Sequence, residues 1–375
     1  MNKVYITSYS SVSSLGIGIE QSLINLSKEI QPIVFPGNND KFNKPYFPIS
    51  ENLSADTDKI ICSQFALKLI DLIENRLNSF DSIPLFLSTS TGGIKETEDV
   101  YEGLYNKTIN YPLFERHFFG RIIEDIKVKY KDKIIYPFTI STACSSSGHS
   151  IKQAFELIKS GVIDKAIVIG VDVLCYTTMI GFDSLKLVSE KGTKPLTKDR
   201  DGLTLGDGGG ILLLESNPAI EPAAEILSAY SNVDGYHISS PDPEGTEQKK
   251  CILKAVELSG INIEEIDYIN AHGTGTQIND QVEMNIIESL FNSKTVVTSL
   301  KSFIGHTLGA SAIAEIALAL GMFKKGRIYQ VKGLSNVMNP EYIPAASIDK
   351  KVKYFLKNSF GFGGNNVSLV IKNLF

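Results

Sequence analysis

Short apolar runs rich in β-branched residues alternate with amphipathic stretches along most of this chain. The apolar runs predict buried strands at 166–173, 210–214, 266–270 and 367–371. Apolar residues spaced three and four positions apart predict helices at 59–73, 248–258 and 281–290. Buried strands that alternate with helices are typical of an α/β fold, in which helices cover both faces of the sheet.

A Pro-containing stretch interrupts this alternation and predicts a division of the chain. The segment NPAIEP at 217–222 separates a longer N-terminal half (1–216) from a shorter C-terminal half (217–375). Both halves contain a strand-like run, a small-residue turn and a helix, first around ACSSSGH and again around SFIGH. Strand–turn–helix units are common, so coincidence stays open, but the repeat favours two related halves.

Composition and charge argue against several classes of protein. The 375 residues are 43% hydrophobic and 21% charged, with a formal net charge of −5, so nothing favours a nucleic-acid partner. The four cysteines are far apart and lack metal-ligand spacing, so we expect neither a metal site nor disulfides. Without a signal-peptide pattern or a run that could span a bilayer, a cytoplasmic protein with no membrane partner is expected.

Cys144 is the main candidate for a nucleophile. It stands in STACSSSGHS, between an expected strand and an expected helix, among side chains small enough to leave room for a substrate. A helix N-terminus favours a thiolate and lowers its pKa, and free backbone N–H groups there can stabilise an oxyanion. From this segment alone, a buried inert cysteine is an equally good interpretation. The remaining cysteines are interpreted as structural: Cys62, Cys175 and Cys251.

Two histidines stand in glycine-containing turns that follow expected strands. His272 lies in INAHGTGTQ, and His306 lies in KSFIGHTLG, five residues after Lys301. The C-terminal ends of parallel strands commonly carry functional groups, although a single histidine there is more often structural. The other histidines lack this setting and are interpreted as structural: His117, His149 and His237.

The glycine-rich segment NSFGFGGNN precedes the last expected strand. Its glycines permit unusual backbone conformations, and Phe360 and Phe362 offer large apolar side chains. A phosphate-binding loop is a poor interpretation because a strand follows, not a helix. A plain turn and a mobile loop whose phenylalanine gates an apolar pocket both stay open. GLTLGDGGG lacks the lysine of a nucleotide-binding loop, so no cofactor is expected.

Six segments, in order, resemble the elongating β-ketoacyl-[acyl carrier protein] synthases of the thiolase-fold superfamily. They are VYITSYSSVSSLG, TACSSS, DRDGLTLGDGGG, HGTGTQINDQVE, KSFIGHTLGASAIAE and NSFGFGGNN, and they extend over almost the whole chain. The resemblance implies a five-layered αβαβα fold made of two related halves. It also implies acyl- and malonyl-loaded carrier proteins as partners. A homodimer is expected, with a heterodimer with a related subunit as the alternative.

The same resemblance implies roles for individual residues. The catalytic set carried over from the family is Cys144, His272, His306 and Lys301. The supporting residues carried over are Glu315, Phe360 and the gating Phe362. In the family the cysteine accepts an acyl group, with its own backbone N–H and that of the gating phenylalanine as the oxyanion hole. The histidines then stabilise the enolate that forms when malonyl-carrier protein loses CO2.

The histidine pair also separates this chain from other members of the superfamily. Degradative thiolases have a second cysteine where His306 stands, and initiating synthases have a Cys-His-Asn set. Two departures from the family are visible. Asp207 stands where a glutamate is usual, and the segment that resembles the acyl pocket contains the unusual residues Lys186, Leu187 and Glu190. Acyl length therefore stays open, and a specialised polyene or polyketide pathway is slightly favoured over housekeeping fatty acid synthesis.

Two other functions stay open from the sequence. A non-condensing partner subunit could keep these residues and rely on a second chain, although the intact Cys-His-His-Lys set argues against it. A Cys-His thioester hydrolase is less favoured, because the second histidine and the lysine have no role in it and no orienting Asn or Asp motif is evident.

Overall fold

The computed structural model describes residues 1–36, 42–49, 59–108 and 115–375. The strands before residue 216 are β1 (Val4–Ser13), β2 (Gly16–Ile17), β3 (Ile83–Ser88), β4 (Ile134–Ile140), β5 (Lys165–Asp172) and β6 (Gly208–Glu215). The helices before residue 216 are α1 (Ile19–Leu26), α2 (Ile61–Asp71), α3 (Glu74–Leu77), α4 (Ile94–Tyr105), α5 (Gly120–Tyr130), α6 (Ser146–Lys159) and α7 (Tyr176–Ser184).

The rest of the chain alternates in the same way. Its strands are β7 (Ala224–Val233), β8 (Tyr268–Asn270), β9 (Val296–Thr298), β10 (Arg327–Ile328), β11 (Ile348–Asp349), β12 (Tyr354–Phe360) and β13 (Asn365–Asn373). Its α-helices are α8 (Thr246–Ser259), α9 (Gln277–Leu290), α10 (Lys301–Ile304) and α11 (Ser311–Lys324). The 3-10 turns are η2 (Ile263–Glu265), η3 (Leu308–Ala310) and η4 (Phe362–Gly364).

The order of strands in the main sheet repeats one arrangement. The strands lie in the order β4-β3-β5-β6-β1-β7-β13-β12-β8-β9, with β2 paired to β1. Each half contributes five strands to this order, β2 being left aside. When the five strands of a half are numbered along the chain, both halves run 3-2-4-5-1 from the outer edge of the sheet to the β1–β7 junction. In both halves the outer pairs are parallel and the inner pairs antiparallel. Two related halves would have this arrangement; the division between residues 216 and 217 stays a prediction.

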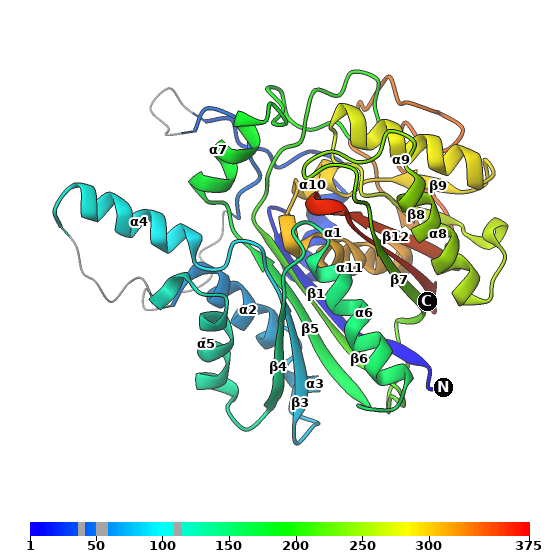
Figure 1. Ribbon diagram of the computed structural model, residues 1–375. Helices are drawn as coiled ribbons and strands as arrows, with labels where there is room; N and C mark the ends of the chain where they lie inside the picture. Colours follow the sequence, from blue (N-terminus) through cyan, green and yellow to red (C-terminus); the bar gives the residue numbers. More distant parts are fainter. Residues whose placement is uncertain (37–41, 50–58, 109–114) are drawn as a thin grey trace.

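Helices α6 and α11 lie between the two half-sheets. Alternate strand residues point inward to them, for example Val168 and Leu212 from the first half and Leu369 from the second. The intervening residues, such as Ile167 and Ile169, pack against the outer helices α2 and α5. Helices α8 and α9 cover the second half-sheet in the same way. Figure 1 shows these two outer pairs on opposite sides of the molecule, which gives five layers in the order αβαβα.

Small residues explain how a helix can lie between two sheets. Residues 311–323 of α11 are all buried, which is typical of a helix surrounded by protein. Its sequence, SAIAEIALALGMF, alternates large side chains with alanines that let the backbones come close. A Cβ at Gly210 of β6 would lie 2.6 Å from the backbone nitrogen of Ala314. Gly210, the last glycine of the run GDGGG, is therefore where α11 packs against β6.

Most of the predicted elements are confirmed, with differences at their ends. The four predicted strands correspond to β5, β6, β8 and β13, and the predicted helices at 248–258 and 281–290 correspond to α8 and α9. The predicted strand at 266–270 is shorter, because the Ile266 N–H still closes the preceding 3-10 turn. The predicted helix at 59–73 ends at Asp71, and a separate short helix, α3, follows it.

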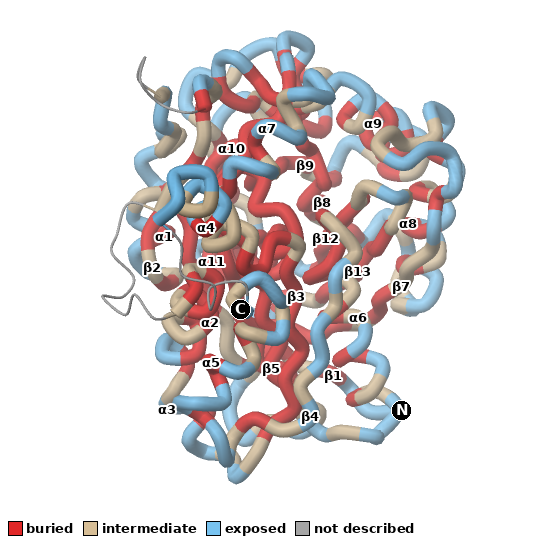
Figure 2. Tube along the Cα trace, turned by 60° about the vertical axis from the view of Figure 1, so that its left-hand side comes forward, coloured by how far each residue is buried: buried red, intermediate tan, exposed pale blue. Residues whose placement is uncertain are grey.

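Burial follows the layers. Figure 2 shows the buried segments concentrated in the strands and inner helices, whereas most connections and α4 contain exposed residues. Within the part of the chain that the structure describes, no helix is long and apolar enough to cross a membrane.

Candidate active site

Cys144 lies in a tight turn between β4 and α6. Ala143 adopts a left-handed conformation with a φ of 52°, which is uncommon for a residue with a side chain. The Thr142 N–H donates to the Ser146 hydroxyl at 2.8 Å, and that hydroxyl donates to the Ala143 carbonyl at 2.6 Å. The small serines of this segment therefore close the turn and place Cys144 just before the buried end of α6. The Cys144 side chain is only 5% exposed.

Burial controls the electrostatics of this thiol. Desolvation raises the pKa of Cys144 to about 11, and the charge of Asp172 acts in the same direction. The ammonium of Lys301 and the backbone N–H groups of Phe362 and Cys144 lower the pKa of Cys144, but by less. Burial outweighs these interactions, so the pKa of Cys144 is raised and not lowered as the helix N-terminus alone would predict. The N–H groups near the sulfur are nevertheless the two expected in the oxyanion hole.

His272 follows the end of β8 and is fixed through its backbone. Its N–H donates to Oε1 of Glu283 at 2.9 Å, and the N–H of Gly273 donates to Oε2 of the same carboxylate at 2.9 Å. The imidazole is buried, and its Nδ1 has no hydrogen-bond partner among the described residues. Burial, followed by the charge of Lys301, holds the pKa of His272 well below its usual range. The ring is therefore neutral at physiological pH.

His306 lies between α10 and η3, and its tautomer follows from its contacts. The Leu308 N–H donates to Nδ1 of His306 at 3.2 Å, so this nitrogen is an acceptor and the proton is on Nε2. Burial and the charge of Lys301 hold the pKa of His306 well below its usual range. The ring centroids of His272 and His306 are 5.5 Å apart, with an angle of 84° between the ring planes. Two neutral imidazoles thus face one another at nearly right angles.

Lys301 and Glu315 lie behind this pair. Lys301 begins α10, Glu315 is in α11, and both side chains are fully buried. The Nζ of Lys301 is 2.7 Å from Oε1 of Glu315. Neither side chain is among the cavity-lining residues, so Lys301 acts on the histidines through its charge.

A cavity of about 310 Å³ joins the candidate residues. Cys144, His272 and His306 line it together with Phe360 and Phe362. The ring of Phe360 lies 6.1 Å from that of His272, and the ring of Phe362 lies 5.4 Å from that of Phe182 in α7. The structure therefore brings the candidate nucleophile, the histidine pair and the candidate gate into one cavity. No group of three His, Cys, Asp or Glu side chains suited to a metal occurs among the described residues.

Comparison with known proteins identifies the family of this chain. The models of the β-ketoacyl synthase N-terminal and C-terminal domains match residues 137–219 and 223–334. A 3-oxoacyl-[acyl-carrier-protein] synthase 2 from Synechocystis is 32% identical over 84% of this chain and 80% of its own length. The chain belongs to the β-ketoacyl synthase family. This confirms the family and the condensing acyltransferase class that were predicted from the sequence.

Two further similarities bear on its place in the family. A 3-oxoacyl-[acyl-carrier-protein] synthase 1 from Buchnera aphidicola is 35% identical over 63% of this chain, and the match covers 61% of that relative. A solved ketosynthase complex with its chain length factor, from Xenorhabdus doucetiae, matches with a TM-score of 0.90 and 27% identity. That match covers 100% of this chain and 98% of the solved one, and it confirms the thiolase-like α/β fold.

Several residues of this β-ketoacyl synthase were not singled out by the sequence. Asp172, at the end of β5, accepts hydrogen bonds from the Ser90 and Thr91 N–H groups at 2.8 Å and from the Gly309 N–H at 2.6 Å. It thereby ties the loop after β3 to the segment that follows His306. Its only sequence signal is a carboxylate that directly follows an apolar strand.

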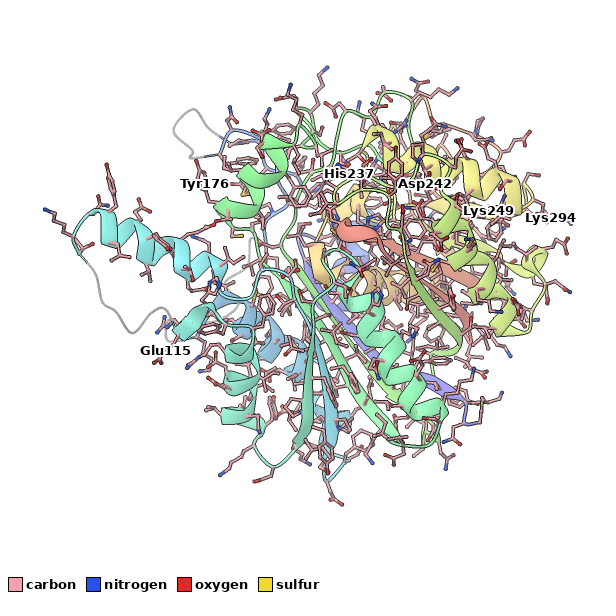
Figure 3. All side chains as sticks on the ribbon, viewed as in Figure 1. Glu115, Tyr176, His237, Asp242, Lys249 and Lys294 are labelled. Atoms are coloured by element: carbon pink, nitrogen blue, oxygen red, sulfur yellow. The ribbon has the colours of Figure 1, made fainter. Side chains whose placement is uncertain are left out.

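His237 was interpreted as structural, but it lines the cavity. Figure 3 shows His237 in the upper middle of the molecule, beside Asp242, with Tyr176 to its left at the start of α7. The other cysteines are buried outside the cavity lining, with burial as the main cause that raises the pKa of each: Cys62, Cys175 and Cys251.

The departures from the family have distinct settings. Asp207 accepts hydrogen bonds from the Leu174 N–H at 2.6 Å and the Ile49 N–H at 3.3 Å, and burial raises its pKa to about 6. Lys186 and Leu187 line the cavity, whereas Glu190 forms an ion pair with Lys44 away from it. Lys186 and Leu187 therefore border the cavity that contains the candidate residues.

Proposed function

We propose that this chain catalyses the decarboxylative condensation of an acyl group, held on Cys144, with malonyl-[acyl carrier protein]. The observation that carries the proposal is the single cavity that contains Cys144 and two neutral imidazoles, His272 and His306. A neutral imidazole has one N–H group, and this group can donate a hydrogen bond to a developing oxyanion. The names of the curated relatives support the carrier-protein substrates.

The reaction has two stages. In the first, the sulfur of Cys144 attacks the thioester carbon of an acyl-carrier protein, and the carrier thiol leaves with a proton. The N–H groups of Cys144 and Phe362, which lie near the sulfur, stabilise the tetrahedral oxyanion. Because the thiol pKa is about 11, its proton has to be transferred as the substrate binds and the sulfur attacks.

In the second stage, the malonyl carboxylate leaves as CO2 and its bonding electron pair forms an enolate. The N–H groups of His272 and His306 stabilise the enolate oxygen. The enolate carbon attacks the acyl group on Cys144, the sulfur leaves as a thiolate, and this thiolate takes up a proton. Lys301 is assigned a positioning and electrostatic role, because its ammonium is paired with Glu315 behind the cavity. Phe360 supports His272, and Phe362 gates the cavity.

A dimer is part of the proposal. Strand β4 ends the sheet and leaves one edge unpaired by the described residues. It exposes Tyr136 by 70% and Phe138 by 48%, and such an apolar edge can pair with another chain. The solved ketosynthase complex contains a chain length factor, so a related subunit is one candidate partner and a second copy is the other.

We also propose a cytoplasmic location, a nucleophile half at 1–216 and a histidine half at 217–375.

The decisive experiment combines mass spectrometry with product analysis. Purified protein is incubated with acyl-carrier proteins of graded chain length and then with malonyl-carrier protein. We expect an acyl adduct on Cys144, no adduct in Cys144→Ala, and a normal adduct in the control Cys62→Ala, whose buried sulfur is outside the cavity lining. An adduct that never yields ketoacyl product would favour a non-condensing partner subunit. Rapid release of free acid would favour a hydrolase.

A further inference from the structure

Lys357 is a fully buried lysine that stands in none of the motifs singled out from the sequence. It lies on β12, three residues before Phe360, and its side chain is 0% exposed. Its Nζ is 2.7 Å from Oε2 of Glu315 and 3.2 Å from Oδ1 of Asn270. The other oxygen of Glu315 pairs with Lys301 at 2.7 Å. One buried carboxylate is therefore held between two ammonium groups.

This arrangement is costly as a purely structural device. Moving a charge out of water costs several kcal/mol unless partners compensate, and an apolar side chain of similar volume often stabilises a core better. Lys357 points toward α11, where its strand neighbour Phe355 packs against Phe323 in the apolar core. Within this group two ammonium ions share a single carboxylate, so the second ammonium is not needed to neutralise Glu315. The catalytic cavity, in which negative charge develops, is the part of the protein that can use this charge.

We propose that Lys357 is a positioning residue for the condensation step, which fixes Glu315 against Lys301 and adds a second positive charge behind His272 and His306. The inference rests on the proposed function and deepens it. Two lysines that share one carboxylate, not Lys301 alone, then add to the effect of burial in keeping both histidines neutral.

The charged groups around Lys357 favour this positioning role. Lys357 faces Glu315 on α11, Lys301 on α10 and Glu283 on α9. Burial and the charge of Lys301 lower the pKa of Lys357 to about 8, against the opposing effect of Glu315. Lys357 therefore carries its charge below about pH 8 and loses it as the pH rises through that value. The charge of Lys357 in turn helps to lower the pKa of both His272 and His306.

The test compares Lys357→Met, which keeps the length of the side chain without its charge, with wild type. Lys353→Met is the control, because Lys353 is exposed and its charge is outside the core. We expect acylation of Cys144 to stay within about threefold of wild type. Malonyl decarboxylation should fall by about 10- to 100-fold, as for a misplaced reacting group. The alkaline limb of the decarboxylation profile near pH 8 should disappear, and the control should match wild type in each assay.

A direct measurement separates positioning from simple stabilisation. NMR titration of labelled histidines should show the pKa of His272 and His306 rising in Lys357→Met. Unchanged histidine titrations and an unchanged pH profile, with only a lower unfolding temperature, would overturn the proposal. Lys357→Gln keeps a hydrogen-bond donor without the charge, and it repeats the test if the methionine variant does not fold. If wild type itself neither acylates Cys144 nor decarboxylates malonyl-carrier protein, the proposed function fails, whereas the titrations still decide the role of Lys357.

Discussion

Gly305, the residue before His306, allows a specific perturbation of one histidine. Its φ is 68° and its ψ is −173°, a combination that is essentially restricted to glycine. A Cβ there would lie 2.7 Å from Cδ2 of Phe47 and 2.9 Å from the Thr204 carbonyl oxygen. That carbonyl also accepts the hydrogen bond of the His306 N–H at 2.7 Å. Gly305→Ala must therefore change the backbone that positions His306.

Two effects set the size of the expected losses in stability and in decarboxylation rate. Holding a residue with a side chain in this conformation costs about 1–3 kcal/mol of unfolding free energy. Both contacts are also shorter than the 3.0 Å that Cβ atoms essentially always keep, so the backbone has to rotate away. A shift of about 1 Å in a reacting group costs about 100-fold in rate. We therefore expect Gly305→Ala to lose about 100-fold in malonyl decarboxylation, with a smaller loss in acylation of Cys144.

The assay measures CO2 release from malonyl-carrier protein, alongside urea unfolding. Gly260→Ala is the matched control, because Gly260 also has a positive φ, 74°, but no described atom lies within 4 Å of a Cβ built there. The control should lose about 1 kcal/mol of stability, as expected for a left-handed residue, and none of its activity. Wild-type decarboxylation by a folded Gly305→Ala protein would refute the claim that this backbone conformation positions His306.

Three other outcomes can be measured. His306→Ala should depress malonyl decarboxylation more than acylation of Cys144, and equal losses would contradict the division of labour. Phe362→Ala removes the ring that contacts Phe182 and should alter acyl transfer several-fold with little change in unfolding temperature; unchanged kinetics would exclude the gate. Because both histidines have a folded-state pKa below the unfolded value, the unfolded chain binds more protons as the pH falls below about 6.5. Stability should therefore fall by about 1.4 kcal/mol per pH unit for each histidine, and His306→Asn should show a correspondingly shallower slope in urea unfolding than wild type.

Local patterns were enough to predict most elements and to select the candidate residues that line one cavity, although their catalytic roles stay predictions. Cys144 and His272 stand in the turns that follow β4 and β8, and His306 stands in a glycine-containing turn, so each was visible within a short segment. The run GDGGG was excluded as a nucleotide loop from its sequence. The close packing of Gly210 against α11 could be recognised only once the helix was in place. A glycine that admits a helix backbone cannot be distinguished in sequence from one that permits a turn.

The electrostatics of the site could not be predicted, because they depend on residues far apart in the chain. Lys357 and Glu315 are separated by 42 positions, and Asp172 and Gly309 by 137. The expected lowering of the Cys144 pKa failed for the same reason. The helix N-terminus is a local feature, whereas the burial that outweighs it comes from packing of both halves around the turn.

The repeated strand–turn–helix unit explains why a nucleophile and a histidine meet in one cavity. Cys144 precedes the central helix α6 by two residues, and His306 precedes α11 by five. The starts of these helices touch, since the Ala312 N–H donates to the Ser147 hydroxyl at 3.0 Å. Each half-sheet extends outward from the β1–β7 junction in the same strand order, so the turns that lead into the two central helices converge. A duplication would thus create a two-sided site at once, and later differences between the turns would give one side the sulfur and the other the imidazole.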